Sequence, residues 1–116
     1  MIRKLFTKIF TKAGYEVETA ESAAEAIEIM RENPYWVLFL DLDMPPGMNG
    51  MELCKIIKDD WPMAICHAVT GYVSLFELAT CREAGFEDYF PKPVDVADLM
   101  DTAEHAFKKL KRWGRP

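Results

Sequence analysis

Histidine and cysteine are scarce in this chain of 116 residues, which has two histidines and three cysteines. The three cysteines, Cys54, Cys66 and Cys81, are widely spaced and form no CxxC pair. A disulfide framework or a structural zinc site is therefore not expected. Each cysteine lies among apolar residues, so we expect all three to be small core residues.

Long uninterrupted apolar runs are also missing. The apolar positions near the N-terminus are interrupted by Lys4, Lys8 and Lys12, which excludes a signal peptide and a membrane span there. The net charge of -5 argues against a general, direct nucleic-acid binder. Half of the residues are hydrophobic and 28% are charged. This composition indicates one soluble globular domain over residues 1–116, with a cytoplasmic location as the default.

Helical and strand patterns alternate along the chain. Apolar residues recur at helical spacing before Gly14, which predicts a helix there. Apolar and polar residues alternate over residues 15–19, which predicts a short strand. Ser22 with Glu25, and Ser74 with Glu77, have the spacing of capping boxes at helix starts. Further strands are predicted at 36–41, 63–69 and 86–90, and further helices at 50–59, before Gly85 and after Asp95. The last helix is expected to bury Leu99, Ala103, Phe107 and Leu110.

This alternation predicts an α/β fold with a parallel sheet and helices on both faces. Four polar residues follow predicted strands at their carboxyl ends, namely Asp41, Asp43, Thr70 and Lys92. The carboxyl ends of parallel strands share one edge, where such sheets place their ligand sites. A carboxylate nucleophile, a hydroxyl and a cation that meet there could form and hold an acyl phosphate.

The ordered set of motifs resembles the receiver domain of response regulators in two-component signalling. The resemblance rests on DLDMP at 41–45, NG at 49–50, VTG at 69–71 and YFPKP at 89–93. Thr70 and Lys92 are 22 residues apart, as in the family. The resemblance covers essentially the whole chain and implies a flavodoxin-like, doubly wound sheet of strand order 2-1-3-4-5.

The resemblance also implies roles for individual residues. Asp41 would be the phosphoacceptor, Thr70 the switch hydroxyl and Lys92 the phosphate-binding lysine. Tyr89 would be the aromatic whose rotamer reports phosphorylation, and the Lys92–Pro93 bond would be cis. Mg²⁺ would be held by Asp41 and by position 43, where the backbone carbonyl of Asp43 is favoured over its side chain. The phosphoryl group would come from a sensor histidine kinase or a phosphotransfer protein.

The sequence departs from the family in two places. The family's opening strand ends in a pair of acids that hold Mg²⁺, and counting back from Asp41 places that strand before Met1. We therefore expect a fold without its first strand, a weak metal site and impaired phosphorylation, because Mg²⁺ needs several oxygen ligands. The sheet could close up, borrow a strand or exchange elements in a homodimer. The loop after Asp41 also carries one extra residue.

Three functions remain open at this point. The first is a non-enzymatic, phospho-accepting receiver, and the second is a pseudo-receiver that acts only by binding other proteins. The third rests on the DxD formed by Asp41 and Asp43, which also resembles the start of haloacid-dehalogenase-type phosphatases. That motif favours Thr or Val at the position of Pro45, and the chain is short for such an enzyme.

Overall fold

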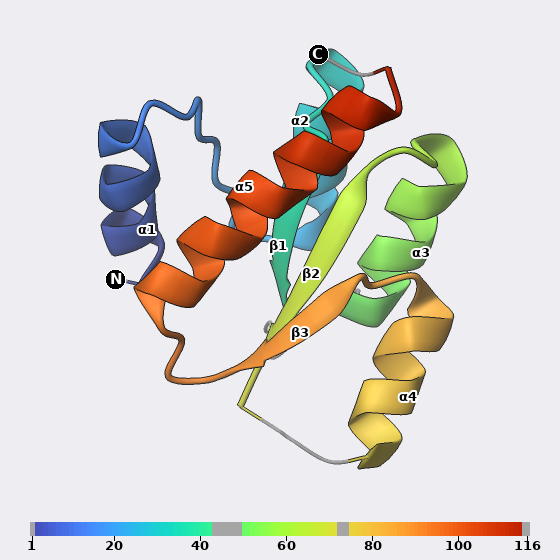
Figure 1. Ribbon diagram of the computed structural model, residues 1–116. Coiled ribbons are helices and arrows are strands. Elements are labelled where there is room, and N and C mark those ends of the chain that lie inside the picture. The colour runs from blue at the N-terminus through green and yellow to red at the C-terminus, as the bar shows by residue number, and fades with distance from the viewer. Residues whose placement is uncertain (1, 43–49, 72–74, 115–116) are drawn as a thin grey trace.

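Three parallel strands form the centre of the molecule. The computed structural model describes residues 2–42, 50–71 and 75–114. Strands β1 (Val37–Asp41), β2 (Ile65–Thr70) and β3 (Asp88–Pro91) lie in the order β1-β2-β3 (Figure 1). In the register, Asp41 lies opposite Val69 and Thr70 lies opposite Pro91. The carboxyl ends of all three strands therefore meet at one edge of the sheet, as the parallel arrangement requires.

Five helices surround the sheet in the described residues. They are α1 (Ile2–Lys12), α2 (Ala23–Glu32), α3 (Gly50–Asp60), α4 (Leu75–Ala84) and α5 (Val96–Arg112). Helix α5 crosses one face of the sheet with α1 beside it, while α3 and α4 lie on the other side (Figure 1). No helix in the described ranges is long and apolar enough to cross a membrane.

Local sequence signals fix several helix ends. The Ser22 hydroxyl accepts a hydrogen bond from the Glu25 N–H at 3.1 Å, and the Asp95 carboxylate accepts one from the Ala97 N–H at 2.8 Å. These side chains satisfy N–H groups that have no partner within their helices. Gly14 and Gly85 follow α1 and α4 with φ angles of +98° and +106°, a conformation that favours glycine at a helix end. The second expected capping box, at Ser74, lies outside the described residues.

The hydrophobic core has a larger and a smaller part, one on each face of the sheet. All six residues of β2 are buried, as expected for a strand covered on both faces. Cys66 and Ala68 pack with residues of α2, α3 and α4 in the larger cluster. Ile65 packs with Ala106 and Leu110 of α5 in the smaller one. The three cysteines are buried and unoxidised, which confirms their expected place in the core.

Two expectations about individual segments are wrong. Residues 15–19 form no strand, because alternation creates a strand only where a neighbouring strand offers backbone partners. Among the residues that the structure describes, no strand lies between this segment and β1, where the order 2-1-3-4-5 would place one. Phe107 is 39% exposed, and Ala106 takes the buried position instead. The Phe107 ring stacks on Tyr15 with centroids 5.3 Å apart.

Strand β1 lies at one edge of the sheet. The Trp36 carbonyl accepts from the Ile65 N–H and the Leu42 N–H donates to the Val69 carbonyl. The N–H and C=O groups of successive residues point to opposite sides of a strand. The backbone groups of the even-numbered residues of β1 therefore point toward β2. The backbone groups of Val37 and Phe39 then point to the opposite edge, where no strand of the described ranges pairs with them.

Candidate functional site

Asp41, Thr70 and Lys92 converge at the carboxyl edge of the sheet, as the sequence predicts. Asp41 ends β1, Thr70 ends β2 and Lys92 directly follows β3. The Lys92 N–H donates to the Thr70 carbonyl at 2.8 Å, which continues the β2–β3 pairing beyond Pro91. The backbone of Lys92 is thereby held in register with the end of β2.

An ion pair joins two of these residues. Lys92 Nζ lies 3.0 Å from Oδ1 and 3.1 Å from Oδ2 of Asp41, so the ammonium donates to both carboxylate oxygens. The side chain of Asp41 is 44% exposed and that of Lys92 is 30% exposed. A reactant can therefore reach the carboxylate from solvent while the lysine holds it. Because the pair is partly solvated, its attraction is screened and contributes little to folding.

Thr70 occupies a more enclosed position than the ion pair. Its side chain is 1% exposed, on a strand that is buried throughout. A buried hydroxyl needs a hydrogen-bond partner, and none of the described buried side-chain nitrogen or oxygen atoms lacks one. Thr70 is therefore a buried polar group that is not without a partner, one residue beyond Val69, the strand partner of Asp41.

Gly50 brings α3 close to the end of β1. A Cβ atom added at Gly50 would lie 3.0 Å from the Asp41 carbonyl oxygen and 2.7 Å from Cδ2 of Leu42. Only glycine allows the backbones to approach this closely. The Asn-Gly pair in the sequence identifies the position as a turn, but the contact with Asp41 is tertiary and no local pattern shows it.

The described residues do not supply a magnesium site. Asp43, the second expected contributor, lies outside the described residues, as does the lengthened loop that follows it. Among the described residues, no group of three or more His, Cys, Asp or Glu side chains could hold a metal ion. Since Mg²⁺ takes near-octahedral oxygen coordination, Asp41 alone does not fit it.

Tyr89 lies on β3, three residues before Lys92. Tyr89 is partly buried and packs against the larger core cluster. Its backbone N–H donates a hydrogen bond to the Asp88 carboxylate at 2.8 Å. The Lys92–Pro93 peptide bond is cis, which confirms the expectation for this position.

A second polar region lies away from the carboxyl edge, between α5 and strands β2 and β3. A cleft of about 180 Å³ is lined there by His67, Glu87, Asp88, His105 and Lys109, among others. Glu87 and Lys109 form an ion pair of 2.6 Å on its rim. The hydrogen bond from Lys109 is the main reason that the pKa of Glu87 is lowered.

His67 is a satisfied histidine of the central strand, as expected. It is 1% exposed, and its Nδ1 lies 3.2 Å from the Leu38 carbonyl oxygen. A carbonyl only accepts hydrogen bonds, so Nδ1 carries the proton. Burial lowers the pKa of His67, while the hydrogen bond and the nearby Asp88 and Glu87 charges oppose that shift. The ring is therefore neutral near neutral pH and stacks on Phe39 at 4.8 Å.

Comparison with known proteins gives a consistent result over most of the chain. The family model described as the response regulator receiver domain matches residues 1–104. The chain is 30% identical over 115 residues to the DNA-binding transcriptional regulator NtrC of Escherichia coli strain K12, covering 99% of this chain and 24% of NtrC. It is also 30% identical over 101 residues to the polar-differentiation response regulator DivK of Brucella ovis, covering 85% of this chain and 81% of DivK.

Solved structures share the fold. A CheY-like response regulator receiver domain protein from Methanospirillum hungatei gives a TM-score of 0.89 at 28% identity, covering 96% of this chain and 88% of the other. The receiver domain of NtrX from Brucella abortus gives 0.85 at 25% identity, with coverages of 92% and 90%. The chain spans about a quarter of the length of NtrC, so the similarity concerns one domain of that regulator.

Proposed function

Because this chain belongs to the response regulator receiver domain family, we propose that it accepts a phosphoryl group on Asp41. The observation that carries the proposal is the pairing of Lys92 Nζ with both carboxylate oxygens of Asp41, at 3.0 and 3.1 Å. An exposed carboxylate at the carboxyl edge of a parallel sheet, held by a cation, is suited to attack phosphorus.

In this transfer one phosphoryl group passes from a donor nitrogen to a carboxylate oxygen of Asp41. The donor is a phosphohistidine of a sensor histidine kinase or phosphotransfer protein. A carboxylate oxygen of Asp41 attacks phosphorus and the bond from phosphorus to the donor imidazole breaks, which leaves an acyl phosphate on Asp41. Lys92 then pairs with a phosphoryl oxygen instead of the free carboxylate, because the negative charge has moved outward.

Thr70 and Tyr89 form the response to that transfer in our proposal. The Thr70 hydroxyl donates to a phosphoryl oxygen, and Tyr89 changes its side-chain position as Thr70 moves. The support is positional. Thr70 is buried at the end of β2, and Tyr89 is partly buried on the adjacent strand, opposite Ala68. The signal would leave the site through the surface near β3.

The completeness of the metal site decides between two forms of this function. Receiver domains as a family use Mg²⁺, and the expected contributors here are Asp41 and Asp43. The absence of a three-carboxylate group among the described residues favours impaired phosphorylation in this chain. It is also the observation on which the second candidate function rests, a pseudo-receiver that binds partner proteins without being phosphorylated.

The open edge of β1 supports a homodimer as part of the proposal. The outward backbone groups of Val37 and Phe39 have no strand partner in the described residues. Unpaired strand edges favour pairing with another chain. We therefore propose that two copies associate through this edge, in the cytoplasm where the phosphodonor proteins act, without direct contact to nucleic acid or membrane.

Incubation with a small phosphodonor, with and without Mg²⁺, tests the proposal. Metal-dependent gain of one phosphoryl group, seen by intact mass, supports the receiver. A chain that binds Mg²⁺ without labelling, or does neither, supports the pseudo-receiver. Turnover of a generic phosphate ester that is lost in Asp43→Asn would instead support the phosphatase alternative.

A further inference from the structure

The cleft between α5 and strands β2 and β3 contains one ring nitrogen that has no partner within the described residues. His67 Nδ1 donates to the Leu38 carbonyl at 3.2 Å, and the ring forms no other hydrogen bond with the described part of the chain. No completely buried side-chain nitrogen or oxygen in that part lacks a partner. Nε2 of His67 must therefore reach solvent, and the solvent space beside this 1% exposed residue is the cleft.

Nε2 of His67 is a hydrogen-bond acceptor. Because the Leu38 carbonyl can only accept, Nδ1 carries the ring proton. Burial lowers the pKa of His67 below its ordinary value, so the ring is neutral near neutral pH. Nε2 then presents a lone pair to the cleft, and a molecule that occupies the cleft satisfies this atom only by donating a hydrogen bond to it.

A carboxylate lies next to this lone pair. Asp88 is opposite His67 in the β2–β3 register, and both residues line the cleft. Adjacent strands are about 5 Å apart, so the two side chains are cross-strand neighbours on the face of the sheet that α5 covers. Oδ1 of Asp88 accepts from the Tyr89 N–H at 2.8 Å. The second carboxylate oxygen is left to face an occupant of the cleft.

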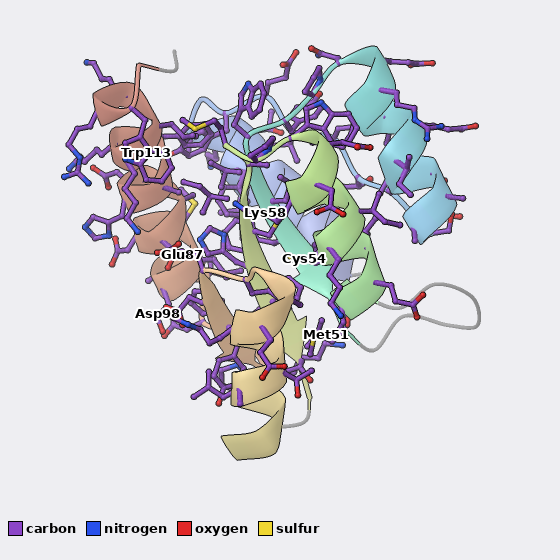
Figure 2. All side chains as sticks on the ribbon, turned by 90° about the vertical axis from the view of Figure 1, so that its right-hand side faces the viewer. Met51, Cys54, Lys58, Glu87, Asp98 and Trp113 are labelled. Atoms are coloured by element: carbon purple, nitrogen blue, oxygen red, sulfur yellow. The ribbon has the colours of Figure 1, made fainter. Side chains whose placement is uncertain are left out.

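The lining of the cleft has a net negative charge. It includes the carboxylates of Glu87 and Asp88 and the ammonium of Lys109, so two negative charges and one positive charge leave -1 when histidines are counted as neutral. Glu87 and Lys109 pair at 2.6 Å, and Figure 2 shows Glu87 beside α5, between Asp98 and Trp113 near the two ends of the helix. Because this pair is self-compensating, the remaining charge is that of Asp88. An anion in the cleft would meet both that charge and the imidazole lone pair.

We propose that this cleft binds a small organic cation that bears N–H groups, either a primary ammonium or a guanidinium. One N–H group donates to Nε2 of His67 and another to the second oxygen of Asp88, whose charge balances that of the ligand. Hydrogen bonds between ionised groups are stronger than those between neutral groups. The cleft measures about 180 Å³. Since a single water needs only roughly 10–15 Å³, a molecule of several heavy atoms fits.

The remaining wall suits the carbon part of such a ligand. Ile65 and Ala106 line the cleft and are both 3% exposed, so methylene groups that contact them are removed from water. Asp41, Thr70 and Lys92 do not line this cleft. The proposal is therefore independent of the phosphoryl transfer proposed for Asp41, and the failure of one leaves the other unaffected.

The test titrates the unmodified, nitrogen-15-labelled chain with methylguanidinium at about pH 7.5 and low salt, where charge attraction is least screened, and follows it by NMR. The expected result is saturable binding, with a shift of the His67 Nε2 resonance and the largest amide shifts at His67, Glu87 and Asp88. Tetramethylammonium has the same charge but no N–H group, and should cause no such shifts. Absence of saturable binding, an equal response to tetramethylammonium, or shifts centred on another part of the chain would overturn the proposal.

Two variants should change the affinity for methylguanidinium in opposite directions. Asp88→Asn keeps an acceptor for the Tyr89 N–H but should weaken binding about tenfold or more, the effect of losing a hydrogen bond to a charged group. Lys109→Met should tighten binding several-fold, because it frees the Glu87 carboxylate and removes a repelling charge. Asp59→Asn, an exposed carboxylate on α3, is the matched control and should leave binding unchanged. Unchanged binding in Asp88→Asn, or weaker binding in Lys109→Met, would contradict the proposed contacts.

Discussion

Lys92 Nζ lies 3.0 Å from Oδ1 of Asp41 and 3.1 Å from Oδ2, so one ammonium serves both oxygens of the carboxylate. The two residues are 51 positions apart in the sequence and meet because β1 and β3 end at the same edge. Neither side chain is buried, so the pair has little value for stability. The geometry of the pair is more consistent with a role in binding a phosphoryl group than with a role in stabilising the fold.

Replacing Lys92 by Ala should therefore separate function from stability. We expect the free energy of unfolding to change by less than about 1 kcal/mol, because the pair is partly solvated. We expect labelling of Asp41 by a small phosphodonor to slow about 100-fold, the scale of losing one charge-stabilising donor. Urea unfolding and intact mass over time measure the two effects. Lys55→Ala, an exposed lysine on α3, is the matched control and should change neither.

Gly50→Ala should destabilise the protein. The added methyl group would meet Cδ2 of Leu42 at 2.7 Å and the Asp41 carbonyl oxygen at 3.0 Å. Overpacking of this kind costs about 1–3 kcal/mol, which exceeds the roughly 0.5–1 kcal/mol that Ala gains over Gly in a helix. Urea unfolding of Gly50→Ala, Leu42→Ala and the double variant measures the coupling. Strictly additive effects would show that the contact with Leu42 is not the cause.

His67 should make the stability of the protein depend on pH. Burial lowers its pKa in the folded chain below the ordinary value of 6.5. Below about pH 6.5 the unfolded chain therefore binds a proton at His67 more readily than the folded chain does. The free energy of unfolding should be highest above about pH 6.5 and should fall as the pH drops through that value. The facing charges of Glu87, Asp88 and Lys109 modulate this effect.

Urea midpoints between about pH 5 and 8 measure the dependence. In His67→Asn the slope in this range should become shallower, whatever the overall loss of stability. The matched control is His105→Gln, which changes an exposed histidine of the same cleft. An unchanged slope in His67→Asn, or a slope lost only in His105→Gln, would assign the pH dependence to another group.

The β1 edge should mediate self-association. Val37 begins β1, and its N–H points away from β2, so Val37→Pro removes an outward donor without breaking the β1–β2 ladder. Proline is tolerated at such edge positions. We expect Val37→Pro to raise the dimer dissociation constant about tenfold or more, the effect of losing roughly one hydrogen bond and its neighbours. Sedimentation equilibrium measures it.

Leu38→Pro is the contrasting variant, because the N–H of residue 38 points toward β2 and its loss should unfold the sheet instead. A wild-type chain that sediments as a monomer at all concentrations, or a dimer unaffected by Val37→Pro while its circular dichroism is unchanged, would remove the role of this edge.

The sequence predicted the candidate site more accurately than it predicted the sheet. The convergence of Asp41, Thr70 and Lys92 follows from a rule that holds for any parallel sheet, so strand order and side-chain detail were not needed. The error at residues 15–19 has a physical cause. Alternation of apolar and polar residues is a property of one segment, whereas a strand forms only when a second segment supplies hydrogen-bond partners for its backbone. The contact of Gly50 with Asp41 and Leu42 is tertiary, and spacing along the chain does not encode it.

The most direct test of the central claim is to locate the phosphoryl group after incubation with a small phosphodonor and Mg²⁺. The matched variants are Asp41→Asn and Asp101→Asn, the latter an exposed carboxylate on α5. We expect a single hydroxylamine-sensitive phosphoryl group, on the peptide that contains Asp41, in the unmodified chain and in Asp101→Asn, and none in Asp41→Asn. Labelling that persists in Asp41→Asn, or that maps to another peptide, would contradict the assignment of Asp41 as the phosphoacceptor.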